Sequence, residues 1–251
     1  MNKTVLTSFT ILCLLSIVFL MGYKISVKAS LDVIHVPIDY LTIQEAINAA
    51  NPGDFIFVYN GTYYENVVVN KTVSLVGEDR VTTIIDGGGT GSVINVTANS
   101  VNINGFTIQN SGSTTSDGGI YVISSGNKIS HNTITNNKNG IYLYYSSNDN
   151  TIHHNNFINN TDQVWSDSVN VWSDDDEGNY GSDYAGQDLY EDGIGDAPYI
   201  IDVNNQDNCP LMGTFSNFTV TWKGETYHGT IICNSTISNF KFEIGPETGT
   251  K

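Results

Sequence analysis

Val101-Asn-Ile-Asn-Gly-Phe106, Ile129-Ser-His-Asn-Thr-Ile134 and Ile152-His-His-Asn-Asn-Phe157 are three copies of one pattern, and Val73-Ser-Leu-Val-Gly77 begins a fourth. The copies begin 28, 28 and 23 residues apart. In the last three, an Asn stands three residues after the opening aliphatic and an apolar residue stands five after it. These are Asn104, Asn132 and Asn155, then Phe106, Ile134 and Phe157. Such regularity indicates a repeated supersecondary unit.

A third apolar piece completes each unit: Ile120-Tyr-Val122, Ile141-Tyr-Leu143 and Val164-Trp165. Three short β-rich pieces separated by Asn, Gly or Ser are typical of a solenoid coil with three strands, whose equivalent strands stack in parallel. The sequence therefore predicts an all-β parallel solenoid. The alternative is a β-sandwich whose strands are separated by turns.

Each coil is expected to bury one aliphatic side chain per strand and to stack Asn at its bends. Asn tolerates left-handed backbone geometry, and its amide can bond the equivalent amide in the next coil. On this pattern Ile134 should face the core and Ser130 the solvent.

A short helix is predicted before the first coil. Thr42 is a suitable N-cap with Glu45 three residues later, and Asn51-Pro-Gly53 stops the helix. Its apolar stripe is Ile43, Ala46, Ile47 and Ala50. Laid across the end of a solenoid, such a helix would cover the core and the unpaired strand edge. Residues 55–58, 61–65 and 67–69 would form the first coil.

Charge is unevenly distributed along the chain. The formal net charge is −16, and 13 Asp and Glu lie between Asp162 and Asp207 while no Lys or Arg occurs between Lys138 and Lys223. Such a surface repels nucleic acid and anionic lipid and suits cations, although surface acid also simply keeps an exported protein soluble. We therefore expect no nucleic-acid partner.

The N-terminus predicts export to the extracellular space or cell surface. An apolar run over residues 5–22 is followed by small residues, so residues 1–29 are either a signal peptide cleaved after Ala29 or a membrane anchor. Cys209 and Cys233 could then form a disulfide or stay unpaired. Candidate glycosylation sites are Asn60, Asn70, Asn95, Asn159, Asn217 and Asn234.

The chain also resembles a known family. The stretch Thr42-Ile-Gln-Glu-Ala-Ile-Asn-Ala-Ala-Asn-Pro-Gly-Asp54, then Tyr59-Asn-Gly-Thr-Tyr63, the Asn-rich coils and Gly178-Asn-Tyr-Gly-Ser-Asp-Tyr184 are similar to NosD-like archaeal and bacterial surface proteins of the pectin-lyase-like superfamily. The resemblance covers roughly residues 33–213. Family members usually carry Trp where Gly181 stands and Tyr where Cys209 stands, and these departures would loosen the closing turn.

The resemblance implies a right-handed parallel β-helix and a domain order. A capped β-helix would span residues 30–172, and an acidic closing segment residues 173–213. Residues 214–251 resemble the start of a β-sandwich module found after such helices, here a short and truncated β module.

The acidic closing segment contains a candidate calcium site. Asp188, Asp192 and Asp196, with Gly193, occupy positions one, five, nine and six of a calcium-loop pattern, and Glu191 could compensate for Tyr190 at position three. Asp174, Asp175, Asp176 and Asp202 are nearby in sequence. The alternative is a solvated acidic turn.

Histidine offers a second candidate metal site. His131 and His154 occupy the same position in adjacent coils, about 5 Å apart if the strands stack. The family resemblance would make copper the metal, although Met ligands are scarce. A hydrogen-bonded polar ladder is the alternative.

The predicted function is binding rather than catalysis. Tyr121, Tyr142, Tyr144 and Tyr145 lie on or beside one stacked strand, where rings could contact a polysaccharide or cell-envelope glycan or merely cover the flank. No catalytic residue is assigned, because the carboxylates of the coils are scattered and no base is in register with them. The rivals are a polysaccharide lyase or glycoside hydrolase and a copper-handling accessory protein.

Overall fold

The computed structural model describes residues 32–174, 176–222 and 225–233, which belong to one compact unit, Asp32–Lys251. The predicted signal peptide or anchor, residues 1–29, lies outside the described residues. Within the described part of the chain, no helix is long and apolar enough to cross a membrane.

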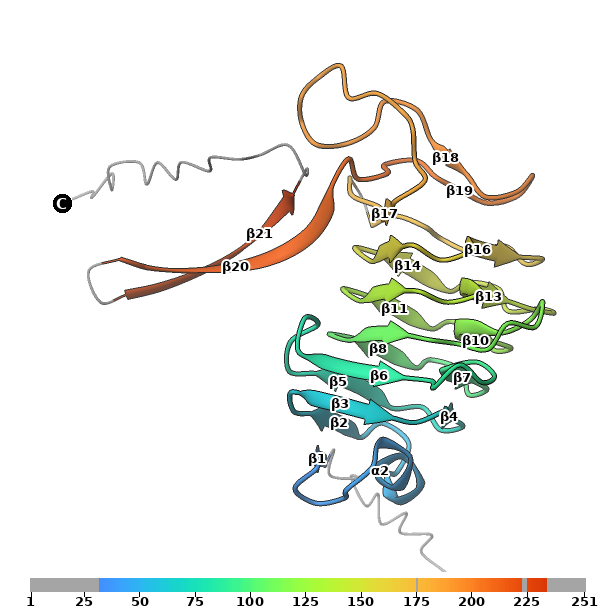
Figure 1. Ribbon diagram of the computed structural model, residues 1–251, viewed down its shortest axis with the longest axis vertical. Helices are drawn as coiled ribbons and strands as arrows, with labels where there is room; N and C mark the ends of the chain where they lie inside the picture. The colour runs from blue at the N-terminus through green and yellow to red at the C-terminus, as the bar shows by residue number, and fades with distance from the viewer. Residues whose placement is uncertain (1–31, 175, 223–224, 234–251) are drawn as a thin grey trace, which may run out of the picture. The chain divides into compact units, whose positions relative to one another are not determined.

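Three parallel sheets form the walls of a right-handed β-helix, as predicted (Figure 1). The first sheet comprises β1 (Val33–Val36), β2 (Phe55–Val58), β5 (Ser74–Gly77), β8 (Asn102–Asn104), β11 (Lys128–Ser130) and β14 (Thr151–His153). The second comprises β3 (Gly61–Tyr64), β6 (Thr83–Asp86), β9 (Thr107–Gln109), β12 (Thr133–Thr135), β15 (Asn156–Ile158) and β17 (Tyr180–Gly181). The third comprises β4 (Val67–Val69), β7 (Ile94–Val96), β10 (Gly118–Val122), β13 (Asn139–Leu143) and β16 (Asp162–Ser166).

The chain visits the three sheets in turn, so each coil contributes one strand to each wall. Strands of two to five residues suffice because each strand inside a sheet pairs with the coil before and the coil after it. One apolar column runs through Ile85, Ile108, Ile134 and Phe157, which are paired in register and buried. The predicted inward orientation of Ile134 is confirmed.

The capping helix is confirmed as α2 (Ile43–Ala49). Thr42 is its N-cap, and Thr42 and Glu45 exchange side-chain-to-backbone hydrogen bonds in a capping box. Ile43, Ala46 and Ile47 are buried in the core, and α2 contacts β1 and the first-coil strands β2 and β4. The helix therefore covers the end of the solenoid core.

Asparagine ladders hold the corners of the coils. At the corner between the first and second sheets, Asn132, Asn155 and Asn179 are buried, and each side-chain oxygen accepts the backbone N–H of the residue one coil earlier. This ladder ends on the Asp207 carboxylate, which accepts the Asn179 N–H at 2.7 Å. Two further ladders, not anticipated from the sequence, contain Asn127, Asn150, Asn170 and Asn205, and Asn137 and Asn160.

The predicted register is wrong for one coil. Ile129 pairs with Ile103 rather than Val101, and Ile134 pairs with Ile108 rather than Phe106. Asn104 therefore lies opposite Ser130 in the first sheet and does not join the ladder. The reason is Gly105, whose φ of +83° turns the same corner that His131 turns one coil later.

The predicted solvent exposure of Ser130 is also wrong: its side chain is only 3% exposed. The outer face is covered at this corner because His131 follows Ser130 directly and Phe215 packs on the histidine rings.

Beyond the coils lie two small antiparallel pairs. β18 (Tyr199–Ile200) pairs with β19 (Gln206–Asp207), and β20 (Thr214–Trp222) pairs with β21 (Glu225–Cys233). The beginning of β20 is attached to the coils by two hydrogen bonds between Asn156 and the backbone of Phe215. Asn156 Oδ1 accepts the Phe215 N–H at 2.8 Å, and Asn156 Nδ2 donates to the Phe215 carbonyl at 3.0 Å.

Candidate functional site

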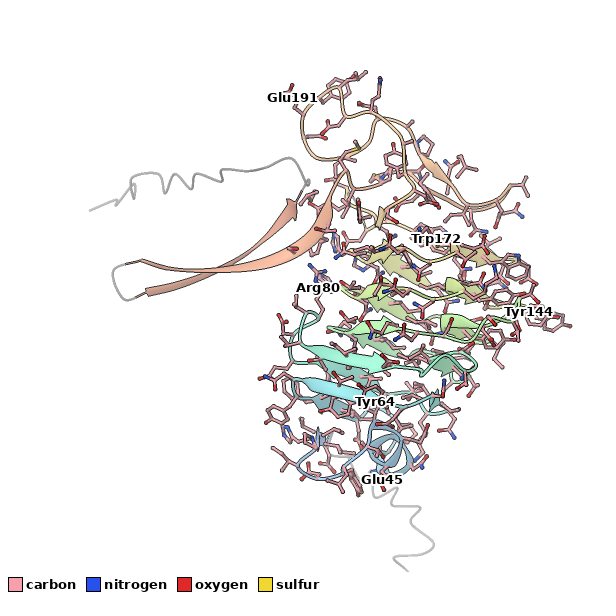
Figure 2. All side chains as sticks on the ribbon, viewed as in Figure 1. Glu45, Tyr64, Arg80, Tyr144, Trp172 and Glu191 are labelled. Carbon is pink, nitrogen blue, oxygen red and sulfur yellow. The ribbon has the colours of Figure 1, made fainter. Side chains whose placement is uncertain are left out.

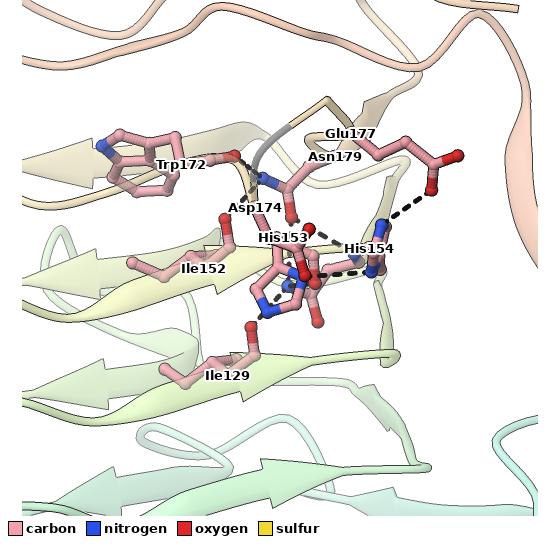
Figure 3. Close-up of polar contacts among 9 residues, drawn as sticks. Ile129, Ile152, His153, His154, Trp172, Asp174, Glu177 and Asn179 are labelled. Carbon is pink, nitrogen blue, oxygen red and sulfur yellow. Dashed lines mark hydrogen bonds and ion pairs between the residues drawn. The ribbon is translucent and has the colours of Figure 1, made fainter.

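Three histidines gather at the corner between the first and second sheets. Two of them, His153 and His154, are shown with their carboxylate neighbours in Figure 3. His131 and His154 follow β11 and β14 at equivalent positions, both with positive φ, and their ring centroids are 5.0 Å apart. His153 is the last residue of β14, and its Nδ1 lies 3.0 Å from His154 Nδ1. Sequence reasoning placed His131 and His154 together but missed His153.

Two carboxylates from the next coil complete this histidine corner. Asp174 Oδ2 is 3.4 Å from His153 Nδ1, and Glu177 Oε2 is 2.8 Å from His154 Nε2, at ion-pair distance although outside hydrogen-bonding geometry. Asp174 and Glu177 are fixed by mutual backbone hydrogen bonds of 2.9 Å. Among the described residues, His153, His154 and Asp174 form the one group of three potential metal-ligand atoms within 4.8 Å of one another.

Burial keeps the imidazoles of His131 and His153 neutral. It lowers the pKa of both His131 and His153 to about 4, with repulsion from His154 as the next cause. Phe215 contributes to the cover, since its ring stacks on His154 at 4.3 Å and 17° and meets the His131 ring edge-on at 5.2 Å. Neutral imidazole nitrogens have lone pairs free for a metal ion.

Acidification is expected to destabilise the fold between pH 6.5 and about 4. In that interval unfolded histidines are protonated while folded His131 and His153 are not, so the free energy of unfolding falls as the pH falls. Asp207 has the opposite effect on stability, because burial raises its pKa to about 6. As the pH falls, its carboxylate is protonated in the folded state before it is protonated in the unfolded state. Urea unfolding of the wild type and of His153→Gln checks this expectation. The loss of unfolding free energy between pH 6.5 and about 4 should be smaller in the variant, by on the order of 1 kcal/mol after allowance for screening. Equal slopes would contradict the buried-neutral assignment.

A second notable surface lies on the third sheet. Tyr121, Tyr142 and Trp165 are neighbours in register on β10, β13 and β16. Their rings stack, with centroids 5.7 Å apart at 19° and 4.2 Å apart at 7°. Tyr144, labelled at the flank of the coils in Figure 2, and Tyr145 are exposed beside this aromatic row. Trp165 was not among the predicted contact residues, although its pairing with Tyr142 was visible in the repeat.

The acidic loop does not gather its carboxylates around one point. Asp188 accepts the N–H groups of Asp192 and Gly193, Asp192 accepts that of Ile194, and Asp196 accepts that of Leu189. These carboxylates therefore hold the loop through its own backbone, and Glu191 is exposed on it (Figure 2). Calcium binding at this loop stays a prediction.

The remaining predicted sites are dispersed. Asn60, Asn70 and Asn159 are exposed and Asn95 is half-buried, whereas the side chain of Asn217 and all of Asn234 lie outside the described part of the chain. Cys209 is a half-buried free cysteine, and the side chain of Cys233 is likewise not described.

The fold and these surfaces define a parallel β-helix protein with an imidazole–carboxylate cluster at one corner and a stacked aromatic row on another wall. Residues 56–186 match the family described as "Periplasmic copper-binding protein (NosD)". Because the match covers more than half of the sequence, this chain belongs to the NosD family.

Comparison with curated proteins gave no match. Among solved structures, the chain is similar to pectin methylesterase PemA from Erwinia chrysanthemi, at 15% identity and a TM-score of 0.42 over 61% of this chain and 57% of that one. A pectin methylesterase bound to a hexasaccharide gives the same values. The carrot enzyme gives 18% identity and a TM-score of 0.40 over 59% of this chain and 54% of that one. The chain thus spans less than two thirds of these structures.

Proposed function

We propose that this chain is an exported NosD-family β-helix protein that binds a transition metal, with copper as the preferred ion, at the histidine corner. The observation that carries the proposal is that His153, His154 and Asp174 each offer one potential ligand atom, and these atoms all lie within 4.8 Å of one another. The family's description as periplasmic and copper-binding supports both the location and the metal.

The donor spacings suit one small ion. Nitrogen ligands about 2.0 Å from a metal lie roughly 2.9 Å apart at a right angle and roughly 3.3 Å apart at a tetrahedral angle. The two Nδ1 atoms are 3.0 Å apart, and Asp174 Oδ2 is 3.4 Å from His153 Nδ1. Imidazole with one carboxylate suits copper, zinc or nickel, and copper(II) binds such sites most tightly among the divalent ions.

Glu177 orients the cluster. Its carboxylate beside His154 Nε2 favours the tautomer with the proton on Nε2, which leaves a lone pair on His154 Nδ1. The contact between the two Nδ1 atoms then requires the proton on His153 Nδ1. A metal at His153 Nδ1 would require this proton to move to His153 Nε2, so that His153 would ligate as a neutral imidazole and would lose no proton to solvent.

Calorimetric titration with copper(II) at pH 7 tests the proposal. His153→Ala and His154→Ala should each weaken binding by more than the roughly 10- to 100-fold expected for Glu177→Gln, which removes only the orienting group. His35→Ala is the matched control, because His35 lies on β1, which precedes the first coil at the far end of the first sheet from β14. Repeating the titration in buffers of different ionisation enthalpy should give no proton release from His153, because its imidazole is already neutral at pH 7. Wild-type affinity in the His153/His154 double variant would contradict the assignment.

We propose carbohydrate or cell-envelope binding, without catalysis, as a second candidate function. The aromatic row on the third sheet supports it, because Tyr121, Tyr142, Trp165 and Tyr144 concentrate aromatic surface on one accessible wall. Aromatic rings present an apolar surface and, in Tyr and Trp, a polar edge, which suits sugars.

A glycan array with the purified chain tests this second function. Trp165→Ala should lose the bound glycans, whereas Tyr64→Ala, which removes an exposed ring from β3 on the second sheet, should retain them. Binding without release of product supports contact alone. Release of unsaturated or reducing sugar ends would instead favour the lyase or hydrolase alternative.

A further inference from the structure

The aromatic row leaves few ring faces free. Tyr142 is stacked between Tyr121 and Trp165, so both of its faces are occupied and it presents its edge to solvent. Because sugars pack their C–H groups on the faces of aromatic rings, Tyr142 itself is a poor platform. The face of Tyr121 turned away from Tyr142 is different, because the neighbour on that side is Asn95 of the preceding coil.

A groove of about 420 Å³ lies at this free face. Its lining includes Tyr121, Asn95, Asn66, Ser92, Ser116 and Asp117. The groove thus combines one aromatic face with side chains that both donate and accept hydrogen bonds, the combination that fixes polar ligands in a binding site.

Several of these polar groups are available to a ligand. Within the described structure the side chains of Asn95 and Ser116 form no hydrogen bonds with other residues. Asp117 uses Oδ2 to accept the Thr114 N–H at 2.9 Å, which leaves Oδ1. Asn66 Nδ2 already donates hydrogen bonds to the carbonyls of Thr90 and Ser92. The groove therefore offers a donor and acceptor on Asn95, a hydroxyl on Ser116 and an acceptor on Asp117.

The charge of the groove restricts the sugar. Among the described residues, no Lys or Arg lines it, and Asp117 is the one carboxylate in its lining. Lys138 on the same wall is bound to Asp162 at 2.7 Å. A uronate carboxylate would lose water without gaining a cation and would meet Asp117 instead.

We propose that the groove beside Tyr121 binds one residue of a neutral saccharide, with the sugar ring on the free face of Tyr121 and its hydroxyls on Asn95, Ser116 and Asp117. This inference rests on the proposed carbohydrate function and names its site and ligand class. It assigns discrimination against uronic acids to Asp117.

The test measures binding of neutral manno- and gluco-oligosaccharides and of the matching mannuronate and glucuronate oligomers. The protein is produced without glycosylation, so that Asn95 keeps its free amide. Wild type should prefer the neutral series. Tyr121→Ala and Asn95→Ala should each weaken neutral binding by at least about fivefold, whereas Tyr121→Phe should bind within about twofold of wild type because the ring face remains. Asp117→Asn should narrow the gap between neutral and uronate oligomers. Tyr145→Ala is the control for an exposed ring outside the groove.

The outcomes separate the groove from the function. If Trp165→Ala loses the glycan while Tyr121→Ala and Asn95→Ala bind normally, carbohydrate binding stands and the groove is overturned. A wild-type preference for uronates overturns the neutral-sugar assignment. If the wild type binds no oligosaccharide, the carbohydrate function fails, and the groove fails with it.

Discussion

Ile134→Asp is expected to lower the free energy of unfolding by about 4 kcal/mol or more, the largest effect of any substitution considered. Ile134 is fully buried between Ile108 and Phe157 in a continuous apolar column. The new carboxyl group would have no partner there and would either stay charged at high cost or be protonated at the cost of a shifted pKa. Equilibrium unfolding in urea measures the loss.

Thr135→Asp is the control for the same strand. Thr135 is the next residue of β12, half-buried on the opposite face, and its substitution should cost no more than about 1 kcal/mol. Similar losses in the two variants would show that the inward and outward faces of β12 are wrongly assigned.

Asn155→Ala is expected to cost about 3 kcal/mol or more, although it removes only a short polar side chain. The Asn155 amide oxygen accepts the N–H of Asn132, and its Nδ2 donates to the carbonyls of Ile129 and His153 and to Asn179 Oδ1. All of these groups are buried, and each partner left unsatisfied costs about 1–3 kcal/mol.

Asn70→Ala provides the comparison, because Asn70 is exposed in the turn after β4. It should change the urea midpoint little. If Asn155→Ala is as mild as Asn70→Ala, the corner ladders do not stabilise the β-helix.

Most of the fold could be predicted because the β-helix repeats its signals. The aliphatic spacing identified the strands, and Thr42 with Glu45 identified the capping helix. The predicted register was wrong at Asn104 because Gly105 and His131 turn the same corner with a positive φ. The repeat of Asn residues did not reveal that these two residues are equivalent. Exposure of Ser130 was mispredicted because the cover over this corner comes from Phe215, 85 positions later in the sequence.

The histidine corner was predicted only in part. The proximity of His131 and His154 could be predicted, because both residues occupy the same position of the repeat in adjacent coils. The contributions of Asp174 and Glu177 depend on the turn that follows the last complete coil, and that turn has no counterpart in the repeat. The pair His153-His154 followed one coil later by an acidic run was the available signal.

The most direct test of the central proposal is anomalous diffraction at the copper edge from crystals soaked in copper(II). The account predicts a single strong peak about 2.0 Å from both His153 Nδ1 and His154 Nδ1, with Asp174 as a third ligand. A strong peak elsewhere, with the histidine corner metal-free and its two Nδ1 atoms still in contact, would contradict it.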